Sequence, residues 1–379
     1  MNYTFSTVLM TVLTSNLLIV VIALCFRNRK IMLSIGYKLL IVFLVLTAIR
    51  FLLPVELPFS RNIYFPEWLS AVVAFVQHVF ISFGIIKVSI SSLLGLVWLG
   101  GSLYHFRRFC RRKSQYRHFV VRYGNNMNRK EPYQTMMAEI CGKRRNPLWV
   151  VRAPYYSAPM QYGTFRPYIV LPTTMELSEE ELYYVLRHET AHYYHHDAFI
   201  KDAISIIRAI YWWNPLCRLL EEKTDILLEM RVDDTLIDGD AATREAYCRT
   251  LDHISEKLQE DPSIPGMGAA LSMATLKGED LRYREIMMHR EKGRKSILFF
   301  LLAGFVAAAY ICSYCFIFEA YLALPWDKEG RNATSDDCLY AIPCEDGTYD
   351  IYMYYDEMDV YLENVDSLEY YIGISIRGE

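Results

Sequence analysis

The chain has 379 residues, of which 53% are hydrophobic and 22% charged, and its formal net charge is −3. Length alone predicts two or three domains, and the apolar excess predicts membrane-spanning segments. Its nine cysteines form no zinc-ribbon pattern and its basic clusters form no nucleic-acid-binding motif, so neither class of protein is expected.

Four apolar stretches are long enough to cross a bilayer. They cover about residues 5–26, 31–53, 88–106 and 297–318. No Lys or Arg precedes the first stretch, so we do not expect it to be a cleaved secretion signal. A further apolar stretch, residues 68–86, is interpreted as interfacial or re-entrant, because a fifth span would move the basic segment RRFCRRK to the outside.

Basic residues predict the orientation of these spans. Clusters of Arg and Lys follow the first and third spans and precede the fourth, and the positive-inside rule places such clusters in the cytoplasm. The predicted organisation is three transmembrane helices in residues 1–106 with an extracellular loop at about 54–87, a cytoplasmic domain in 107–296, a fourth transmembrane helix in 297–318 and an outside tail in 319–379.

The cytoplasmic stretch LSEEELYYVLRHETAHYYHHD contains the pattern HETAH. Ser178 followed by Glu181 is a capping box, which predicts that a helix begins here. His188 and His192 are one helical turn apart, so both imidazoles can bind one metal ion, and Glu189 beside them can take a proton from water. The simpler alternative is two histidines on a helix that bind nothing.

A catalytic zinc site needs a third protein ligand and leaves its fourth position open. Downstream, EEKTDILLEMRVDDTL predicts a second helix, which carries Glu229 and Asp233 on one face. The intervening WWNPL breaks the chain at a proline, which lets the second helix fold back against the first. Asp225 on the same helix is a rival ligand, and spacing alone does not decide between these carboxylates.

Two short segments upstream predict β-strands. LWVVRAP and PYIVLP, residues 148–154 and 167–172, are rich in β-branched residues and bounded by turn formers. A small sheet packed on helices predicts an α+β domain around the HETAH helix.

These motifs together resemble the integral-membrane zinc peptidases of the bacterial antirepressor type, which include the β-lactam sensors BlaR and MecR. The resemblance rests on SAPMQYGTFRPYIVLP, on HETAH followed by His196 and Asp197, on WWNPL, and on Glu229 with Asp233 four residues later. It covers roughly half of the chain, including the four-span layout.

The resemblance implies three zinc ligands, His188, His192 and Glu229. In that family the glutamate that opens the last motif is the third ligand, which selects Glu229 over Asp225. It also implies that Glu189 is the catalytic base and that Asp233 supports the site from behind the ligands.

The chain departs from the family pattern in this last motif. The family usually has a sequence close to ELACD where this chain has EMRVD, so Arg231 and Val232 replace small residues. Neither residue is a ligand, so we expect the change to affect local packing more than catalysis. His195 and His196 are interpreted as polar residues near a helix end and not as further ligands.

Two other features come from the resemblance. Substrate is expected to bind as an added strand along the edge of the small sheet. Self-cleavage ahead of the last span is also expected, and residues 262–280 are a candidate loop for it, although a plain linker explains that segment equally well.

The outside tail, residues 319–379, has fifteen acidic and three basic residues. It lacks both a serine with a lysine three positions on and a KTG motif, so sensing of a β-lactam through an acylated serine is excluded. A sensor that attracts a cationic ligand is one hypothesis, and an acidic β-rich cap is the simpler and favoured one. Cys338 and Cys344 are candidates for a disulfide in this compartment.

The predicted fold class is a mainly α membrane protein with four transmembrane helices, a cytoplasmic α+β gluzincin-like zinc peptidase domain and a small β-rich extracellular tail. The predicted function is that of a Zn²⁺ endopeptidase in the bacterial plasma membrane, which cleaves itself or a BlaI/MecI-like winged-helix repressor in response to an outside signal. Expected partners are this protein or peptide substrate, membrane lipid and, as a candidate assembly, a second copy of the chain. The alternative is a membrane sensor or scaffold whose metal site is structural or vestigial.

Overall fold

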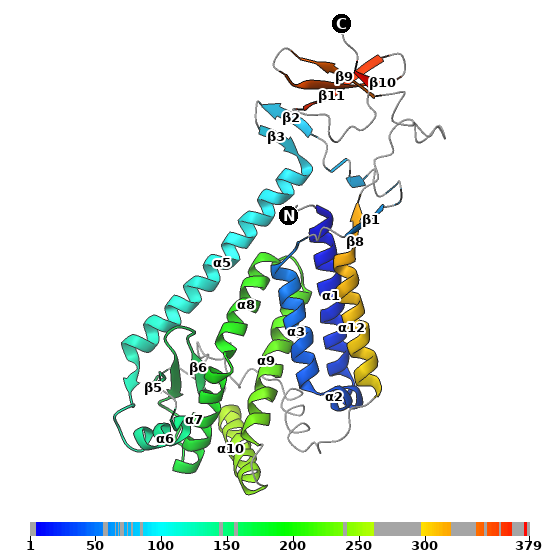
Figure 1. Ribbon diagram of the computed structural model, residues 1–379. Coiled ribbons are helices and arrows are strands. Elements are labelled where there is room, and N and C mark those ends of the chain that lie inside the picture. Colours follow the sequence, from blue (N-terminus) through cyan, green and yellow to red (C-terminus); the bar gives the residue numbers. More distant parts are fainter. Residues whose placement is uncertain are drawn as a thin grey trace. The chain divides into compact units, whose positions relative to one another are not determined.

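The computed structural model is mainly helical (Figure 1). It describes residues 5–55, 60–64, 66, 68, 72–73, 75–76, 79–83, 86–143, 147–154, 158–237, 241–260, 297–319, 339–344, 347–355, 358–365 and 375–376. The chain divides into two compact units, of which the first comprises Met1–Ile63 with Ile90–Phe318 and the second Tyr64–Ser89 with Glu319–Glu379.

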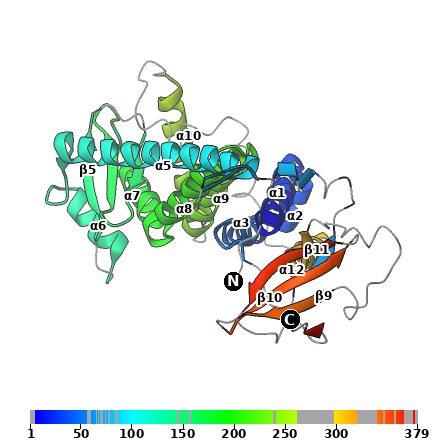
Figure 2. The same cartoon turned by 90° about the horizontal axis from the view of Figure 1, so that it is seen from above.

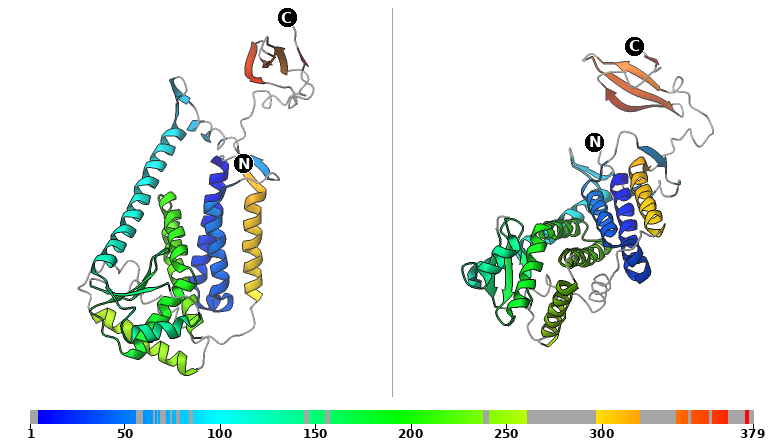
Figure 3. Two further views of the ribbon diagram at one scale, coloured as in Figure 1. Left: turned by 60° about the vertical axis from the view of Figure 1, so that its left-hand side comes forward. Right: turned by 60° about the horizontal axis from the view of Figure 1, so that its bottom comes forward.

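Three apolar helices of the first unit, α1 (Phe5–Arg27), α3 (Tyr37–Leu52) and α12 (Ile297–Cys315), lie side by side (Figures 1 and 3). Two helices of the described part of the chain are long and apolar enough to cross a membrane, at Thr7–Arg27 and Ile297–Cys315. These coincide with the first and fourth predicted spans. Beyond α3 and α12, β1 (Arg61–Tyr64) pairs with β8 (Phe316–Glu319).

The second predicted span is wrong as a single helix. It is divided into α2 (Arg29–Ile35) and α3 at Gly36, whose φ of 77° is a left-handed conformation that favours glycine. The third predicted span is the first part of α5 (Ile90–Tyr123), a continuous helix of 34 residues. It continues past residue 106 because the basic residues that follow are good helix formers, and it ends before Gly124.

The first unit contains a four-stranded sheet with the order β4-β5-β7-β6. Its strands are β4 (Asn125–Asn126), β5 (Trp149–Ala153), β6 (Met160–Tyr162) and β7 (Tyr168–Pro172). β5 and β7 confirm the two predicted strands and pair in parallel, whereas β4 and β6 pair antiparallel at the edges. One face of the sheet packs on α6 (Tyr133–Cys141) and on the HETAH helix, and the other packs on the end of α5 through Val120, Val151 and Val170 (Figure 2).

The HETAH helix, α7 (Glu179–Tyr194), begins at the predicted capping box of Ser178 and Glu181. It is followed by α8 (Asp197–Ile210), α9 (Leu216–Leu236) and α10 (Ala241–Glu260). As predicted from WWNPL, α9 folds back, and it packs on both α7 and α8. The hairpin of α8 and α9 lies between α5 and the helices α1 and α3 (Figures 1 and 3).

The tip of this hairpin is fixed by polar contacts to three neighbouring helices. The Tyr211 hydroxyl donates to the Phe51 carbonyl of α3 at 3.1 Å, and the Asn214 amide donates to Asn16 Oδ1 of α1 at 2.8 Å. The Trp98 indole of α5 donates to the Ile210 carbonyl at 2.8 Å. The hairpin that carries Glu229 is therefore attached directly to the apolar helices.

The second unit is β-rich among its described residues. Its larger sheet has the order β11-β10-β9-β12, with strands β9 (Leu339–Pro343), β10 (Tyr349–Tyr355), β11 (Met358–Val365) and β12 (Ser375–Ile376). Within the apolar stretch 68–86, β2 (Val79–Phe83) pairs antiparallel with β3 (Ile86–Ser89), which continues that stretch. Cys338 and the loop 262–280 lie outside the described residues.

Candidate metal centre

Two helices position the polar residues at the centre of the first unit. On α7, Leu182, Val185 and Leu186 are buried in a cluster with residues of the sheet and of α6, and the helix also packs on α9. His188, Glu189 and His192 follow in the last two turns of α7 and are 2%, 3% and 6% exposed. Glu229 of α9 is 6% exposed, so four polar side chains occupy a buried position between two packed helices.

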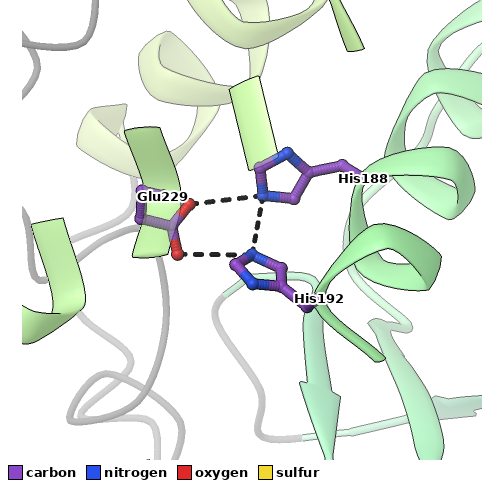
Figure 4. Close-up of side chains that lie close together, drawn as sticks. All are labelled: His188, His192 and Glu229. Atoms are coloured by element: carbon purple, nitrogen blue, oxygen red, sulfur yellow. Dashed lines mark hydrogen bonds and ion pairs between the residues drawn. The ribbon is translucent and has the colours of Figure 1, made fainter. Parts of the chain in front are cut away.

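His188, His192 and Glu229 point towards one another (Figure 4). His188 Nε2 lies 3.0 Å from His192 Nε2 and 3.3 Å from Glu229 Oε2, and His192 Nε2 lies 3.4 Å from Glu229 Oε1. Among the described residues this trio is the one cluster of His, Cys, Asp and Glu that could hold a metal ion. Imidazole nitrogens and a carboxylate oxygen suit divalent transition metals, so the donor set fits such an ion.

The second nitrogen of His192 is held by a buried carboxylate. His192 Nδ1 lies 2.6 Å from Asp197 Oδ2, and Asp197 is 1% exposed. Asp197 Oδ1 in turn accepts from the Arg231 guanidinium, which also donates to the His195 carbonyl. When the ring is neutral, this hydrogen bond places its proton on Nδ1, so that Nε2 keeps its lone pair directed at the cluster.

The second nitrogen of His188 has a different partner. His188 Nδ1 lies 2.8 Å from the hydroxyl of Tyr247, a residue of α10, and that hydroxyl donates to Asp233 Oδ1 at 2.6 Å. The direct separation of His188 Nδ1 from Asp233 Oδ1 is 3.9 Å, which is too long for a hydrogen bond. Asp233 therefore reaches the histidine through a tyrosine.

Negative charge dominates this buried cluster. Burial lowers the pKa of His192, but the charge of Glu229 and the hydrogen bonds to Asp197 and Glu229 outweigh it and raise the pKa to about 10. The arrangement thus favours a positive charge between the histidines and Glu229. A bound divalent cation supplies that charge.

A cavity of about 500 Å³ opens beside the cluster. Glu189, His192 and Glu229 line one part of it, and the edge strand β6 lines another. Residues of α5 and α8 complete the wall, where Lys113 pairs with Asp202, which also accepts from the Thr164 hydroxyl. The cluster is therefore open to a space large enough for several residues of an extended peptide.

Comparison with known proteins shows the family. The sequence model of the family described as "BlaR1 peptidase M56" matches residues 5–277. The chain belongs to this family. The description of this family names a peptidase.

A curated relative is similar over a shorter region. The "Regulatory protein BlaR1" of Bacillus licheniformis is 32% identical over 83 residues, which are 22% of this chain and 14% of the relative. The matched region thus spans about a seventh of the relative's own length.

The other candidate ligands near the two motifs lie outside the trio of His188, His192 and Glu229. Asp225 pairs with Lys201 at 3.3 Å, and its side chain is 45% exposed. His195 and His196 form the turn between α7 and α8, where His196 has a left-handed φ of 59°. None of these residues belongs to the trio of possible ligands.

Three supporting residues were not assigned a role from the sequence. In the sequence, Asp197 is part of a motif, Arg231 is expected to affect packing, and no pattern points to Tyr247. The carboxylate directly after the fourth histidine of HETAHYYHHD is the signal that points to Asp197. Arg231 and Tyr247 act through tertiary contacts that no local pattern specifies.

Proposed function

We propose that this protein is a multi-pass zinc endopeptidase of the bacterial plasma membrane that converts an outside signal into a proteolytic event in the cytoplasm. The observation that carries the proposal is the buried trio of His188, His192 and Glu229 with Glu189 beside it on the wall of an open cavity. A structural metal site needs neither the cavity nor the additional carboxylate.

The ion is proposed to be zinc. In catalytic zinc sites, three protein donors bind a tetrahedral ion at about 2.0–2.2 Å, so any two donors lie about 3.3–3.5 Å apart. The three separations in the trio are 3.0, 3.3 and 3.4 Å. These distances support His188, His192 and Glu229 as the ligands, with a fourth position left for water and substrate.

Each residue of the site then has a defined part in peptide hydrolysis. His188, His192 and Glu229 would hold the zinc ion, which would supply Lewis acidity for the activation of a water and of the scissile carbonyl. Glu189, which faces the cavity, takes a proton from the attacking water and delivers it to the leaving amine. Asp197 and Arg231 fix the orientation of His192, so that its Nε2 stays available as a ligand.

The substrate is proposed to bind as an added strand along β6. This strand lies at an edge of the sheet, and its residues Met160, Gln161 and Tyr162 line the cavity that contains Glu189. An extended peptide on such an edge gains backbone hydrogen bonds regardless of its sequence. The peptide bond next to the trio would then lie within reach of Glu189.

We further propose the membrane topology predicted from the basic clusters. The N-terminus and the tail from residue 319 are outside, four segments span the membrane, and residues 107–296 are cytoplasmic. The apolar helices α1 and α12 support the first and fourth spans. α5 supports a path for the signal, since it begins at Ile90, directly after β3 in the chain, and runs without a break to the wall of the cavity at Arg112 and Lys113.

The signal and the target are also proposals. The tail lacks the motifs of an acylated serine site, so the signal is proposed to be other than a β-lactam. The cleaved proteins are proposed to be the chain itself, within residues 262–280, and a winged-helix repressor of the BlaI/MecI kind. The description of the similar protein as regulatory supports a target with a regulatory role.

The test is a fragment analysis in membranes with a tag at each end of the chain. Wild type and Glu189→Ala are compared for self-cleavage and for loss of a co-expressed candidate repressor. Fragments that disappear in the variant support the peptidase, and their new N-terminus locates the cut. Identical fragment patterns in the two proteins, with zinc bound in both, refute the proposal in favour of a non-proteolytic sensor. Replacing the tail separately tests signalling, because a peptidase without a sensory role would keep its activity.

A further inference from the structure

The two histidines of the trio are supported in different ways. His192 is hydrogen-bonded directly to a carboxylate, with its Nδ1 2.6 Å from Asp197 Oδ2. His188 is hydrogen-bonded to a phenol, with its Nδ1 2.8 Å from the Tyr247 hydroxyl and 3.9 Å from Asp233. Asp233, which the resemblance assigned to the support of the site, is thus too far from His188 Nδ1 for a direct hydrogen bond.

We propose that Tyr247 is a positioning residue of the metal site, which links His188 to Asp233 and thereby holds His188 in the form that binds metal. This inference rests on the proposed function, because it concerns the support of a proposed ligand. It adds a residue from α10 to a site that is otherwise built from α7, α8 and α9.

The distribution of protons follows from the chemistry of the three groups. An ionised Asp233 only accepts hydrogen bonds, so the single hydroxyl proton of Tyr247 is directed to Asp233 Oδ1 at 2.6 Å. The Tyr247 oxygen then accepts from His188, which fixes the proton of His188 on Nδ1. Nε2 of the same ring consequently keeps its lone pair, and this is the atom that lies 3.3 Å from Glu229 Oε2.

Burial makes this link costly to break. Tyr247 is 1% exposed and Asp233 is 2% exposed, and the Tyr247 ring lies nearly parallel to the His188 ring, with their centroids 6.2 Å apart. On its other side Tyr247 packs with Val232 and Leu236 of α9. Without the hydroxyl, the Nδ1 proton of His188 loses its acceptor in a place that water does not reach.

The packing of α10 therefore affects the metal site. Tyr247 is 59 residues away from His188 in the chain, and α10 has no ligand of its own in the trio. The site is therefore complete only when α10 is packed on α7 and α9. Displacement of α10 would weaken metal binding without touching any ligand.

The test is the zinc affinity of Tyr247→Phe in the full-length protein in detergent, measured by competition with a chromophoric chelator. Substitution of such supporting residues typically costs 10–100-fold in metal affinity, and we expect a loss in this range. Tyr184→Phe is the matched control, since its ring lies 6.1 Å from that of Tyr247 and its hydroxyl is outside the His188–Tyr247–Asp233 chain. The control is expected to keep the affinity of wild type.

A second variant covers the case in which Tyr247→Phe does not fold. Asp233→Asn weakens the far end of the same chain, so it is expected to lower zinc affinity as well, and the double variant is expected to be no weaker than Tyr247→Phe alone. Thermal unfolding of the metal-free proteins separates a positioning role from general destabilisation. A metal-free Tyr247→Phe that unfolds like wild type and still binds zinc more weakly supports the inference.

Two results overturn it in different ways. Wild-type zinc affinity in Tyr247→Phe, or in Asp233→Asn where the first variant does not fold, overturns this inference alone and leaves the proposed function standing. A wild-type protein that takes up no zinc overturns both.

Discussion

The Asp197 carboxylate accepts two hydrogen bonds, one on each oxygen, and this makes Asp197→Asn an informative substitution. In the native protein Oδ1 accepts from the Arg231 guanidinium and Oδ2 accepts from His192 Nδ1. Asparagine has nearly the same shape but offers one acceptor oxygen and one NH₂ donor. In either orientation of the amide, one of the two native contacts therefore becomes a donor facing a donor.

The expected cost follows from burial. Asp197 is 1% exposed, so water does not replace the lost partner. A buried hydrogen bond to a charged group contributes about 1.5–3 kcal/mol, and we expect Asp197→Asn to lower the free energy of unfolding by this amount. The substitution also disturbs the hydrogen bond between Asp197 and His192 Nδ1, so zinc affinity should fall by about 10–100-fold.

Asp225→Asn is the control for the same chemical change at an exposed position. Asp225 also pairs with a cation, Lys201 at 3.3 Å, but its side chain is 45% exposed. Exposed ion pairs contribute about 0.2–1 kcal/mol, so we expect a loss below about 1 kcal/mol and no change in zinc affinity.

Unfolding is measured by circular dichroism of the metal-free proteins in detergent, so that loss of zinc does not enter the stability. Zinc affinity is measured separately by chelator competition. Equal effects of the two substitutions would refute the reasoning, because they would show that burial of the Asp197 contacts contributes nothing beyond a surface ion pair.

Three further predictions concern packing, helix capping and pH dependence. A Cβ at Gly101 would lie 2.3 Å from Trp212 Cε2, so Gly101→Ala should lower the free energy of unfolding by about 1–3 kcal/mol. A Cβ at Gly100 would have no atom within 4 Å, so Gly100→Ala should be neutral or stabilising. Equal thermal midpoints of the two variants would contradict the packing of α5 on the hairpin tip. Ser178→Ala should cost about 1 kcal/mol through loss of the N-cap, and Ser178→Asp should retain the stability. Burial raises the pKa of Glu181, but the hydrogen bond from the Ser178 amide and other polar contacts outweigh it and lower the pKa. Its contribution is therefore complete above the ordinary value of 4.5 and is lost as pH falls through the lowered value, so Glu181→Gln should reduce the acid-side loss in a pH series of unfolding midpoints.

The local parts of the site could be predicted because the signals that specify them are local. Ser178 and Glu181 satisfy the first turn of α7 through contacts three residues apart, and the pattern that starts at His188 places two imidazoles on adjacent turns. Glu229 could be chosen over Asp225 only through the resemblance, because both carboxylates lie on one helix. The structure separates them by burial and by partner.

The supporting contacts could not be predicted from the sequence. Arg231 belongs to α9 and reaches Asp197 at the start of α8, and Tyr247 belongs to α10 and reaches α7. Such contacts depend on how four helices pack, and no periodicity of one segment encodes that packing. The division of the second apolar stretch at Gly36 was missed for another reason, since a single glycine within an apolar run does not show by itself whether its φ is positive.

The zinc content of the purified full-length protein tests the central claim most directly. Wild type, Glu229→Ala and Asp225→Ala are purified in parallel, dialysed against a weak chelator and analysed for zinc by mass spectrometry. The account predicts one zinc per chain in wild type and in Asp225→Ala, and little or none in Glu229→Ala. Equal zinc content in all three proteins, or its loss in Asp225→Ala with retention in Glu229→Ala, would contradict the metal centre described above.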